Sequence, residues 1–185
     1  MGQAESEVTG WCSYRPLLRM ALDATDSEVV TGCSGGPVLE LGCGDGSTAW
    51  LDKICEEQNR KLFSLDHKPE YIIPYAHLRS PRHRIELAET WDRLEVERPP
   101  SEWGDRWSVA LVDHAPGERR IVDIRRLADK CDILVIHDTQ HGQARAGYGY
   151  DAIWSLFKYI KHDDRLPEWA TAVSNFVDVT KWELS

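Results

Sequence analysis

Apolar and polar positions alternate along the chain in short blocks whose spacing predicts strands and helices in turn. Five apolar runs have the length and the flanking turn residues of buried strands: 38–41, 61–65, 84–88, 107–112 and 131–136. Elsewhere apolar residues recur at helical spacing, which predicts helices over 14–24, from Ser47 or Thr48 to about 59, and over 70–78, 90–96 and 118–130. Pro74 is expected to break or shorten the third of these helices. Alternation of this kind favours right-handed βαβ units, and therefore a parallel sheet covered by helices.

The last part of the chain has a different pattern. A helix is predicted over 150–160, followed by two β-rich runs over 169–176 and 179–184. These two runs are too close in sequence for a helical crossover, so we predict that they pair as an antiparallel hairpin and make the sheet mixed. Residues 1–13 are predicted to form a flexible arm and 14–185 a single domain, because 185 residues fit one domain. The expected fold class is α/β, with a mostly parallel seven-stranded sheet and helices on both faces.

Composition narrows the range of functions. A net charge of −9 argues against general nucleic-acid binding and against docking on anionic membranes. The hydrophobic fraction of 42% and the charged fraction of 29% are ordinary for a soluble globular protein, and no apolar run is long enough to span a membrane. The five cysteines are scattered without a Cys-x-x-Cys pair, which predicts a reducing, cytoplasmic setting.

A glycine-rich turn follows the first predicted strand and is the clearest sign of a ligand site. Its glycines, Gly42, Gly44 and Gly46, permit a tight turn and let a ligand lie against the backbone. The helix that follows offers free N–H groups to an anion. Glu40 precedes the turn, and Asp66 ends the second strand, where a carboxylate can accept both hydroxyls of a ribose. This combination predicts a nucleoside-containing ligand.

The run VLELGCGDGS at 38–47 resembles the signature of class I S-adenosylmethionine-dependent methyltransferases, which have a Rossmann-like fold. The resemblance implies that Glu40 helps to hold the methionine part of the cofactor and that Asp66 binds its ribose. Glu89 is the nearest match to the acid that meets the adenine amino group, and Trp91 is placed to cover the adenine ring. The expected S-adenosylmethionine contacts are Glu40, Gly42, Cys43, Gly44, Gly46, Asp66, Glu89, Trp91 and Asp113.

Carboxylates and imidazoles gather at the ends of the fourth and fifth predicted strands. Asp113 and His114 follow the fourth strand, and His137 and Asp138 follow the fifth, with His141 shortly after. Carboxylates suit Mg²⁺, and imidazoles would also admit Mn²⁺, Fe or Zn²⁺. The pattern is similar to small metal-dependent O-methyltransferases of the catechol type, which implies that Asp113 and Asp138 are candidate ligands of a divalent cation.

Two positions depart from that metal-dependent pattern. Thr139 stands where the catechol enzymes have an asparagine, and residues 115–117 read Ala-Pro-Gly where those enzymes have a lysine base. Without a metal, His114, His137 or His141 could serve as the general base, since imidazole titrates near neutral pH. The candidate catalytic residues are Asp113, His114, His137 and His141.

The sequence leaves several functions open. The working hypothesis is O-methylation of a small hydroxylated molecule, with or without Mg²⁺ or another divalent cation. Metal-independent N-methylation of a small amine or peptide, and a non-catalytic S-adenosylmethionine-binding module, are the alternatives. A NAD-dependent oxidoreductase is disfavoured, because Ser47 stands where the dinucleotide motif needs a third spaced glycine and Glu40 would lie near a pyrophosphate.

Overall fold

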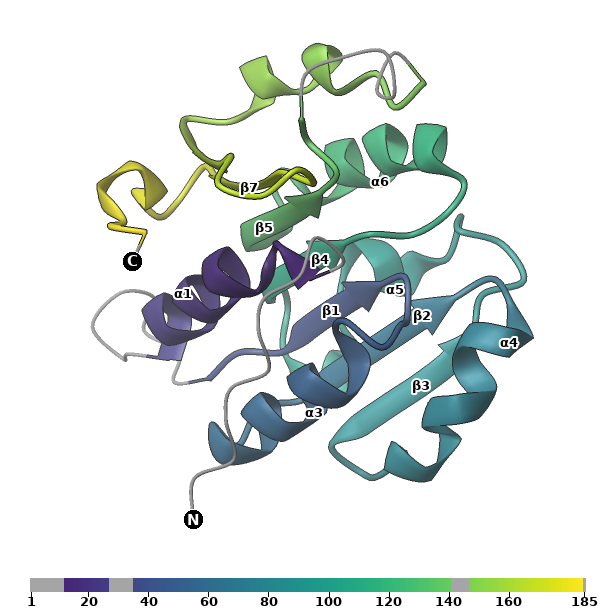
Figure 1. Ribbon diagram of the computed structural model, residues 1–185. Coiled ribbons are helices and arrows are strands. Elements are labelled where there is room, and N and C mark those ends of the chain that lie inside the picture. Colours follow the sequence, from purple (N-terminus) through teal and green to yellow (C-terminus); the bar gives the residue numbers. More distant parts are fainter. Residues whose placement is uncertain (1–11, 27–34, 141–146, 185) are drawn as a thin grey trace.

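The computed structural model of the protein describes residues 12–26, 35–140 and 147–184. Its centre is a seven-stranded sheet with the order β3-β2-β1-β4-β5-β7-β6 (Figure 1). The first five strands pair in parallel, and β7 runs antiparallel to both of its neighbours. The strands are β1 (Val38–Leu41), β2 (Leu62–Asp66), β3 (His83–Leu87), β4 (Trp107–Val112), β5 (Cys131–His137), β6 (Tyr159–Asp163) and β7 (Ala170–Ser174).

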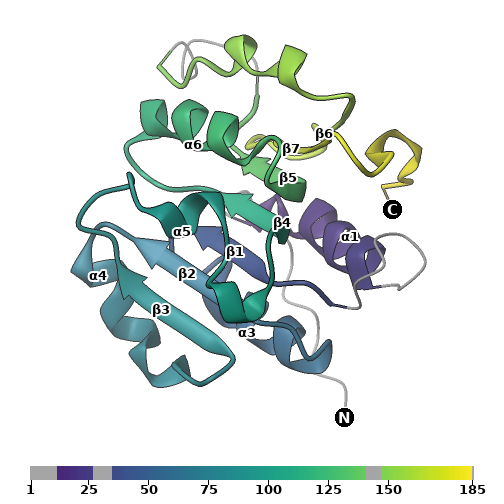
Figure 2. The same ribbon diagram turned by 180° about the vertical axis from the view of Figure 1, so that it is seen from behind.

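Helices cover both faces of this sheet (Figures 1 and 2). The helices α1, α3 and α4 lie on one face, and α5 and α6 lie on the other. Their bounds are α1 (Arg15–Asp26), α3 (Thr48–Glu57), α4 (Pro69–Ile72), α5 (Leu94–Glu97) and α6 (Arg120–Leu127). Short 3-10 helices occupy Ile73–Leu78, Ser101–Trp103, Gly117–Arg119, Tyr150–Ala152, Trp154–Leu156 and Val179–Lys181. None of the helices in the described ranges is long and apolar enough to cross a membrane.

The central strands are buried on both faces, as their continuous apolar runs predict. In β1, Val38 packs into the apolar cluster beneath α1 and α3, while Leu39 and Leu41 pack into the cluster beneath α6. Every residue of β4 and β5 is buried. The two faces therefore form two apolar layers that fix the carboxyl ends of β1, β2, β4 and β5 along one edge.

The structure confirms the predicted α/β fold with a mixed seven-stranded sheet. The five parallel strands lie within one or two residues of their predicted bounds, and the third predicted helix does divide before Pro74, into α4 and a 3-10 helix. The helix predicted over 90–96 is reduced to α5, and the one predicted over 118–130 begins as a 3-10 helix and ends at Leu127.

The prediction for the carboxyl-terminal part was wrong in its elements. The helix predicted over 150–160 is two 3-10 helices followed by β6, and the strand predicted over 179–184 is a 3-10 helix. The antiparallel hairpin exists, but β7 pairs with β6, which precedes it. Ile153, Phe157 and Ile160 have helical spacing in the sequence. That spacing concealed the period of two by which Tyr159 and Ile160 pack on opposite faces of the sheet.

Candidate active site

The glycine turn connects β1 to α3, and two of its three glycines, Gly42 and Gly44, have different structural roles. Gly42 has a φ of +97°, and a Cβ atom there would lie 2.7 Å from the backbone of Asp113. Gly42 is therefore required for β1 and β4 to approach each other. A Cβ atom on Gly44 would meet no atom within 4 Å. The space beside Gly44 is open to a ligand.

Two buried acids hold the turn in place. The Gly44 N–H donates to Thr48 Oγ1 at 3.0 Å, and the Thr48 hydroxyl donates to Glu40 Oε1 at 3.0 Å. The Cys43 N–H donates to Asp66 Oδ2 at 3.0 Å, and the Lys68 N–H donates to Asp66 Oδ1 at 2.8 Å. Asp66 therefore ties the end of β2 to the turn, and each of its oxygens retains a lone pair for another donor.

Glu40 lies beneath the turn and is fully buried. Burial raises the pKa of Glu40 to about 7, although the hydroxyls of Ser47, Ser64 and Thr48 lower it. Its second oxygen, Oε2, has no hydrogen-bond partner among the described residues. This carboxyl group therefore changes its protonation state near neutral pH.

A pocket of about 420 Å³ lies against the turn, within the size range of small-ligand sites. It is lined by Tyr14, Gly42, Cys43, Gly44, Asp45, Gly46, Ser47, Asp66, His67, Tyr71, Asp113 and Ala115. Six of the residues predicted from sequence therefore line one pocket. The lining also includes Tyr14, which the sequence interpretation missed, because a tyrosine before an amphipathic helix carries no signal of a ligand contact.

Three predicted cofactor residues are not part of that lining. Glu40 lies under the turn, and Glu89 is exposed beyond the end of β3. Trp91 is buried, with its Nε1 donating to the Ala115 carbonyl at 3.1 Å and its ring against His114 at a centroid distance of 4.3 Å. Trp91 therefore supports the wall behind the pocket, and a role for these three residues in cofactor binding stays a prediction.

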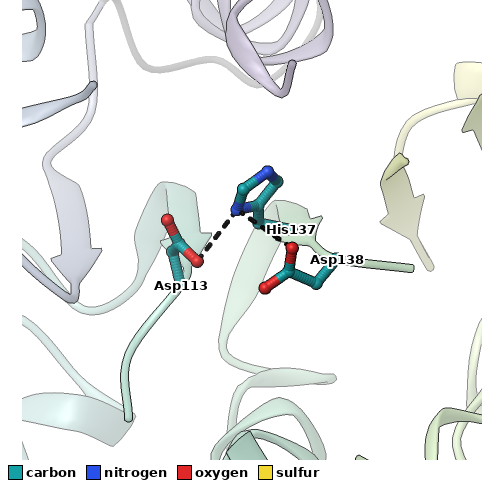
Figure 3. Close-up of side chains that lie close together, drawn as sticks. All are labelled: Asp113, His137 and Asp138. Carbon is teal, nitrogen blue, oxygen red and sulfur yellow. Dashed lines mark hydrogen bonds and ion pairs between the residues drawn. The ribbon is translucent and has the colours of Figure 1, made fainter. Parts of the chain in front are cut away.

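The ends of β4 and β5 bring His137 between a carboxylate and a hydroxyl. His137 Nδ1 lies 3.0 Å from Asp113 Oδ1 and 3.7 Å from Asp138 Oδ1, and both carboxylates lie beside the imidazole (Figure 3). His137 Nε2 lies 3.1 Å from Ser13 Oγ. Burial alone would lower the pKa of His137, but the hydrogen bond and charge of Asp113, with the charge of Asp138, raise it above its ordinary value.

His114 is placed differently from His137. It is buried, its Nε2 lies 3.1 Å from Asp123 Oδ2, and its Nδ1 has no hydrogen-bond partner among the described residues. Burial lowers the pKa of His114 even though the Asp123 carboxylate opposes that change. His114 therefore faces Asp123 of α6, and neither His114 nor His137 is among the residues that line the pocket. His141, the remaining candidate base, lies outside the described residues.

Asp113, His137 and Asp138 also form the group that would have to hold a metal ion. Their potential ligand atoms all lie within 4.8 Å of one another. However, the guanidinium of Arg120 already binds both carboxylates, with Nη2 at 3.0 Å from Asp113 Oδ1 and Nη1 at 3.1 Å from Asp138 Oδ2. A divalent cation between these carboxylates would compete with the guanidinium for their negative charge and would be repelled by it. In this arrangement the donor set does not fit a resident divalent cation.

By sequence, no family model and no curated protein matches the chain. By structure, the chain is similar to solved methyltransferases and related enzymes. Human methyltransferase-like protein 13 in complex with S-adenosylhomocysteine superposes with a TM-score of 0.60 at 12% identity, covering 93% of this chain and 86% of that one. A putative methyltransferase from Thermobifida fusca gives 0.55 at 13% identity, covering 89% and 80%. Spermidine synthase from Thermotoga maritima gives 0.59 at 14% identity, covering 100% and 69%. The chain therefore has the Rossmann-like fold of class I S-adenosylmethionine-dependent methyltransferases.

Proposed function

We propose that this protein is an S-adenosylmethionine-dependent methyltransferase that methylates a hydroxyl group of a small molecule. The observation that carries this proposal is the position of Asp113. Asp113 is among the residues that line the pocket, and its carboxylate also accepts the hydrogen bond of the His137 imidazole. A cofactor pocket and a candidate general base therefore share one residue, and the acceptor would be bound where they meet.

The residues around the pocket fit the cofactor. The space beside Gly44 admits a ligand against the backbone, and Asp66 has lone pairs for ribose hydroxyls. Asp45 and Asp66 give the lining negative charge that favours a cationic sulfonium, whereas the charge of Asp113 is paired with Arg120. When bound, S-adenosylmethionine supplies a methyl group on a positively charged sulfur. The fold likeness to a structure holding S-adenosylhomocysteine supports the same ligand.

His137 has the surroundings of a general base. Asp113 accepts the Nδ1–H, which leaves the lone pair on Nε2, the atom that now faces Ser13 Oγ. An acceptor hydroxyl that takes the place of the Ser13 hydroxyl would give its proton to Nε2. The oxygen would then be ready to accept the methyl group that S-adenosylmethionine, held by the glycine turn and Asp66, would supply, with the electron pair of the broken carbon–sulfur bond left on sulfur. Asp113 stabilises the imidazolium that forms.

The test separates binding from transfer. Calorimetry with S-adenosylhomocysteine should show binding by the wild type and its loss in Asp66→Asn, with Asp129→Asn, an exposed aspartate far from the pocket, as the matched control. Radiolabelled methyl transfer should then be measured on panels of phenols, sugars and amines. Absence of binding would leave only a scaffold role, and transfer confined to amines would contradict O-methylation.

His137→Gln provides the second arm. It should keep S-adenosylhomocysteine binding and lose methyl transfer by on the order of 10²- to 10⁴-fold, the usual contribution of a general base. His77→Gln, which changes an exposed histidine on the 3-10 helix Ile73–Leu78, should change neither quantity. Unchanged transfer in His137→Gln would remove His137 from the mechanism.

A further inference from the structure

We propose that the Arg120 guanidinium takes the place of a divalent cation between Asp113 and Asp138, so that the wild-type site works without a metal. Shortening this side chain would uncover a latent metal site made of Asp113, His137 and Asp138.

The contacts of Arg120 tie together the carboxyl ends of β4 and β5. Its Nη2 donates to the Asp113 carboxylate at 3.0 Å and to the Asp113 carbonyl at 3.0 Å. Its Nη1 donates to Asp138 Oδ2 at 3.1 Å, and its Nε donates to the His114 carbonyl at 2.7 Å. The planar, branched donor group of arginine matches this set of acceptors, whereas a single ammonium group does not.

The guanidinium of Arg120 is buried and held in place by the residues packed around it. Arg120 is only 5% exposed, and the ring of Tyr148 covers its guanidinium at 5.0 Å from the ring centroid. Tyr148 itself packs on Gly117, where an added Cβ atom would lie 1.9 Å from the ring. The Tyr150 hydroxyl lies 3.4 Å from Nη1 and donates to the His137 carbonyl. The side chain thus cannot swing away without disturbing the segment that follows β5.

The positive charge between Asp113 and Asp138 comes from Arg120, and this distinguishes the site from a metal centre. The carboxylates of Asp113 and Asp138 both face the guanidinium of Arg120, and arginine keeps its proton in proteins. The guanidinium therefore stays charged, neutralises part of the carboxylate pair and leaves His137 Nδ1 facing Asp113. A cation of this kind orients Asp113 and His137 without acting as a Lewis acid on an acceptor oxygen.

The experiment uses Mn²⁺ as an electron-paramagnetic-resonance probe on the full chain. The wild type should show no Mn²⁺ binding that depends on Asp138. Arg120→Ala should gain a single site, with at least roughly tenfold tighter binding than the wild type, because the guanidinium then no longer competes for the two carboxylates. Arg120→Ala/Asp138→Asn should lose it. Arg120→Lys, which keeps the charge, should bind Mn²⁺ as weakly as the wild type.

Two results would overturn the proposal that Arg120 takes the place of a metal ion. Wild-type Mn²⁺ binding that Asp138→Asn abolishes would overturn the proposal, and so would a folded Arg120→Ala protein without a gained site. Folding is checked by the thermal transition and by S-adenosylhomocysteine binding. If Arg120→Ala does not fold, the wild-type arm still decides the proposal. These readouts do not require methyl transfer, so failure of the proposed function and failure of this inference are separable.

Discussion

Asp113 Oδ1 lies 3.0 Å from His137 Nδ1, and the pairing of two parallel strands sets this distance. Val112 at the end of β4 is in register with Ile136 in β5, so Asp113, just after β4, lies beside His137, the last residue of β5. The pair is thus built into the central strands of the sheet. A rigid position of this kind is suited to a group that transfers protons.

The first prediction concerns the pH dependence of methyl transfer. The hydrogen bond and charge of Asp113 help to raise the pKa of His137 above its ordinary value. A base must be neutral, so the rate should increase with pH and level off above that raised pKa. Asp113→Asn removes the stabilisation of the imidazolium, so the midpoint should move to lower pH while the plateau rate falls. Steady-state kinetics between about pH 5 and 9 measure both.

Asp113→Asn can also contradict the assignment of His137 as the general base. If Asp113→Asn lowers the plateau without moving the midpoint, His137 is not the titrating base. S-adenosylhomocysteine affinity should be measured in parallel, because Asp113 also lines the pocket. A shift of the midpoint in kcat is independent of that affinity and therefore isolates the pair.

The two glycines of the turn should respond differently to alanine. Gly44→Ala should fold with an unchanged melting temperature but bind S-adenosylhomocysteine more weakly, because its Cβ atom enters open pocket space. Gly42→Ala should lower the free energy of unfolding by about 2–4 kcal/mol, because φ is +97° and its Cβ atom would collide with the Asp113 backbone. Calorimetry and chemical denaturation measure the two effects. Equal loss of stability in both variants would contradict this division of roles.

Much of the fold was predictable because its signals are local. Continuous apolar runs identified the five parallel strands, and the glycine turn with Asp66 located the ligand pocket. The hairpin partner was misassigned, since the helical spacing around Phe157 gave no sign that Tyr159–Asp163 pairs with β7. Pairing between strands depends on long-range contacts, and a single sequence does not display them.

The candidate site was predictable only in part, for a related reason. Asp113, His137 and Asp138 were found because strand ends meet at one edge of the sheet. Arg120 was missed, because it lies on α6 in a helix rich in arginine, and only the tertiary structure shows which arginine reaches the carboxylates. Ser13 was assigned to the flexible arm, but it is 2% exposed and contacts His137. Which cation neutralises Asp113 and Asp138 is therefore decided by how α6 packs on the sheet, and the sequence alone does not show it.

Glu40→Gln should stabilise the protein without ligand in a pH-dependent way. The folded-state pKa of Glu40 is about 7, above the ordinary value of 4.5. The stability that Glu40 provides in its protonated form is complete below about pH 4.5 and is lost as pH rises to about 7. Glutamine can still accept the Thr48 hydrogen bond. The variant should therefore match the wild type near pH 4 and exceed its free energy of unfolding by up to about 3 kcal/mol above pH 7.

Chemical denaturation at several pH values checks this prediction. Thr48→Val, which removes the hydroxyl that donates to Glu40, serves as the comparison and should destabilise the protein at every pH. A stability difference between Glu40→Gln and the wild type that does not vary with pH would mean that Glu40 keeps the same protonation state throughout.

Arg60 should be a main anchor of α1, the helix whose start carries Ser13 and Tyr14 into the site. Its guanidinium is fully buried and donates to the Leu22 carbonyl at 2.7 Å, to Thr25 Oγ1 at 3.0 Å and to Ser108 Oγ at 3.1 Å. Arg60→Met keeps the apolar volume but leaves these acceptors without their donor. We expect the free energy of unfolding to fall by about 2–4 kcal/mol, since each buried unsatisfied group costs about 1–3 kcal/mol and the removed charge offsets part of that.

The matched control for Arg60→Met is Arg19→Met, which changes an arginine of α1 itself. Arg19 pairs with Asp23 one turn later, and both side chains are 50% exposed. Exposed pairs of this kind contribute about 0.3–0.5 kcal/mol, so Arg19→Met should change stability little. Denaturant titration of both variants gives the comparison. If Arg60→Met costs no more than Arg19→Met, then the apolar face of α1, and not the buried guanidinium, holds the helix against the sheet.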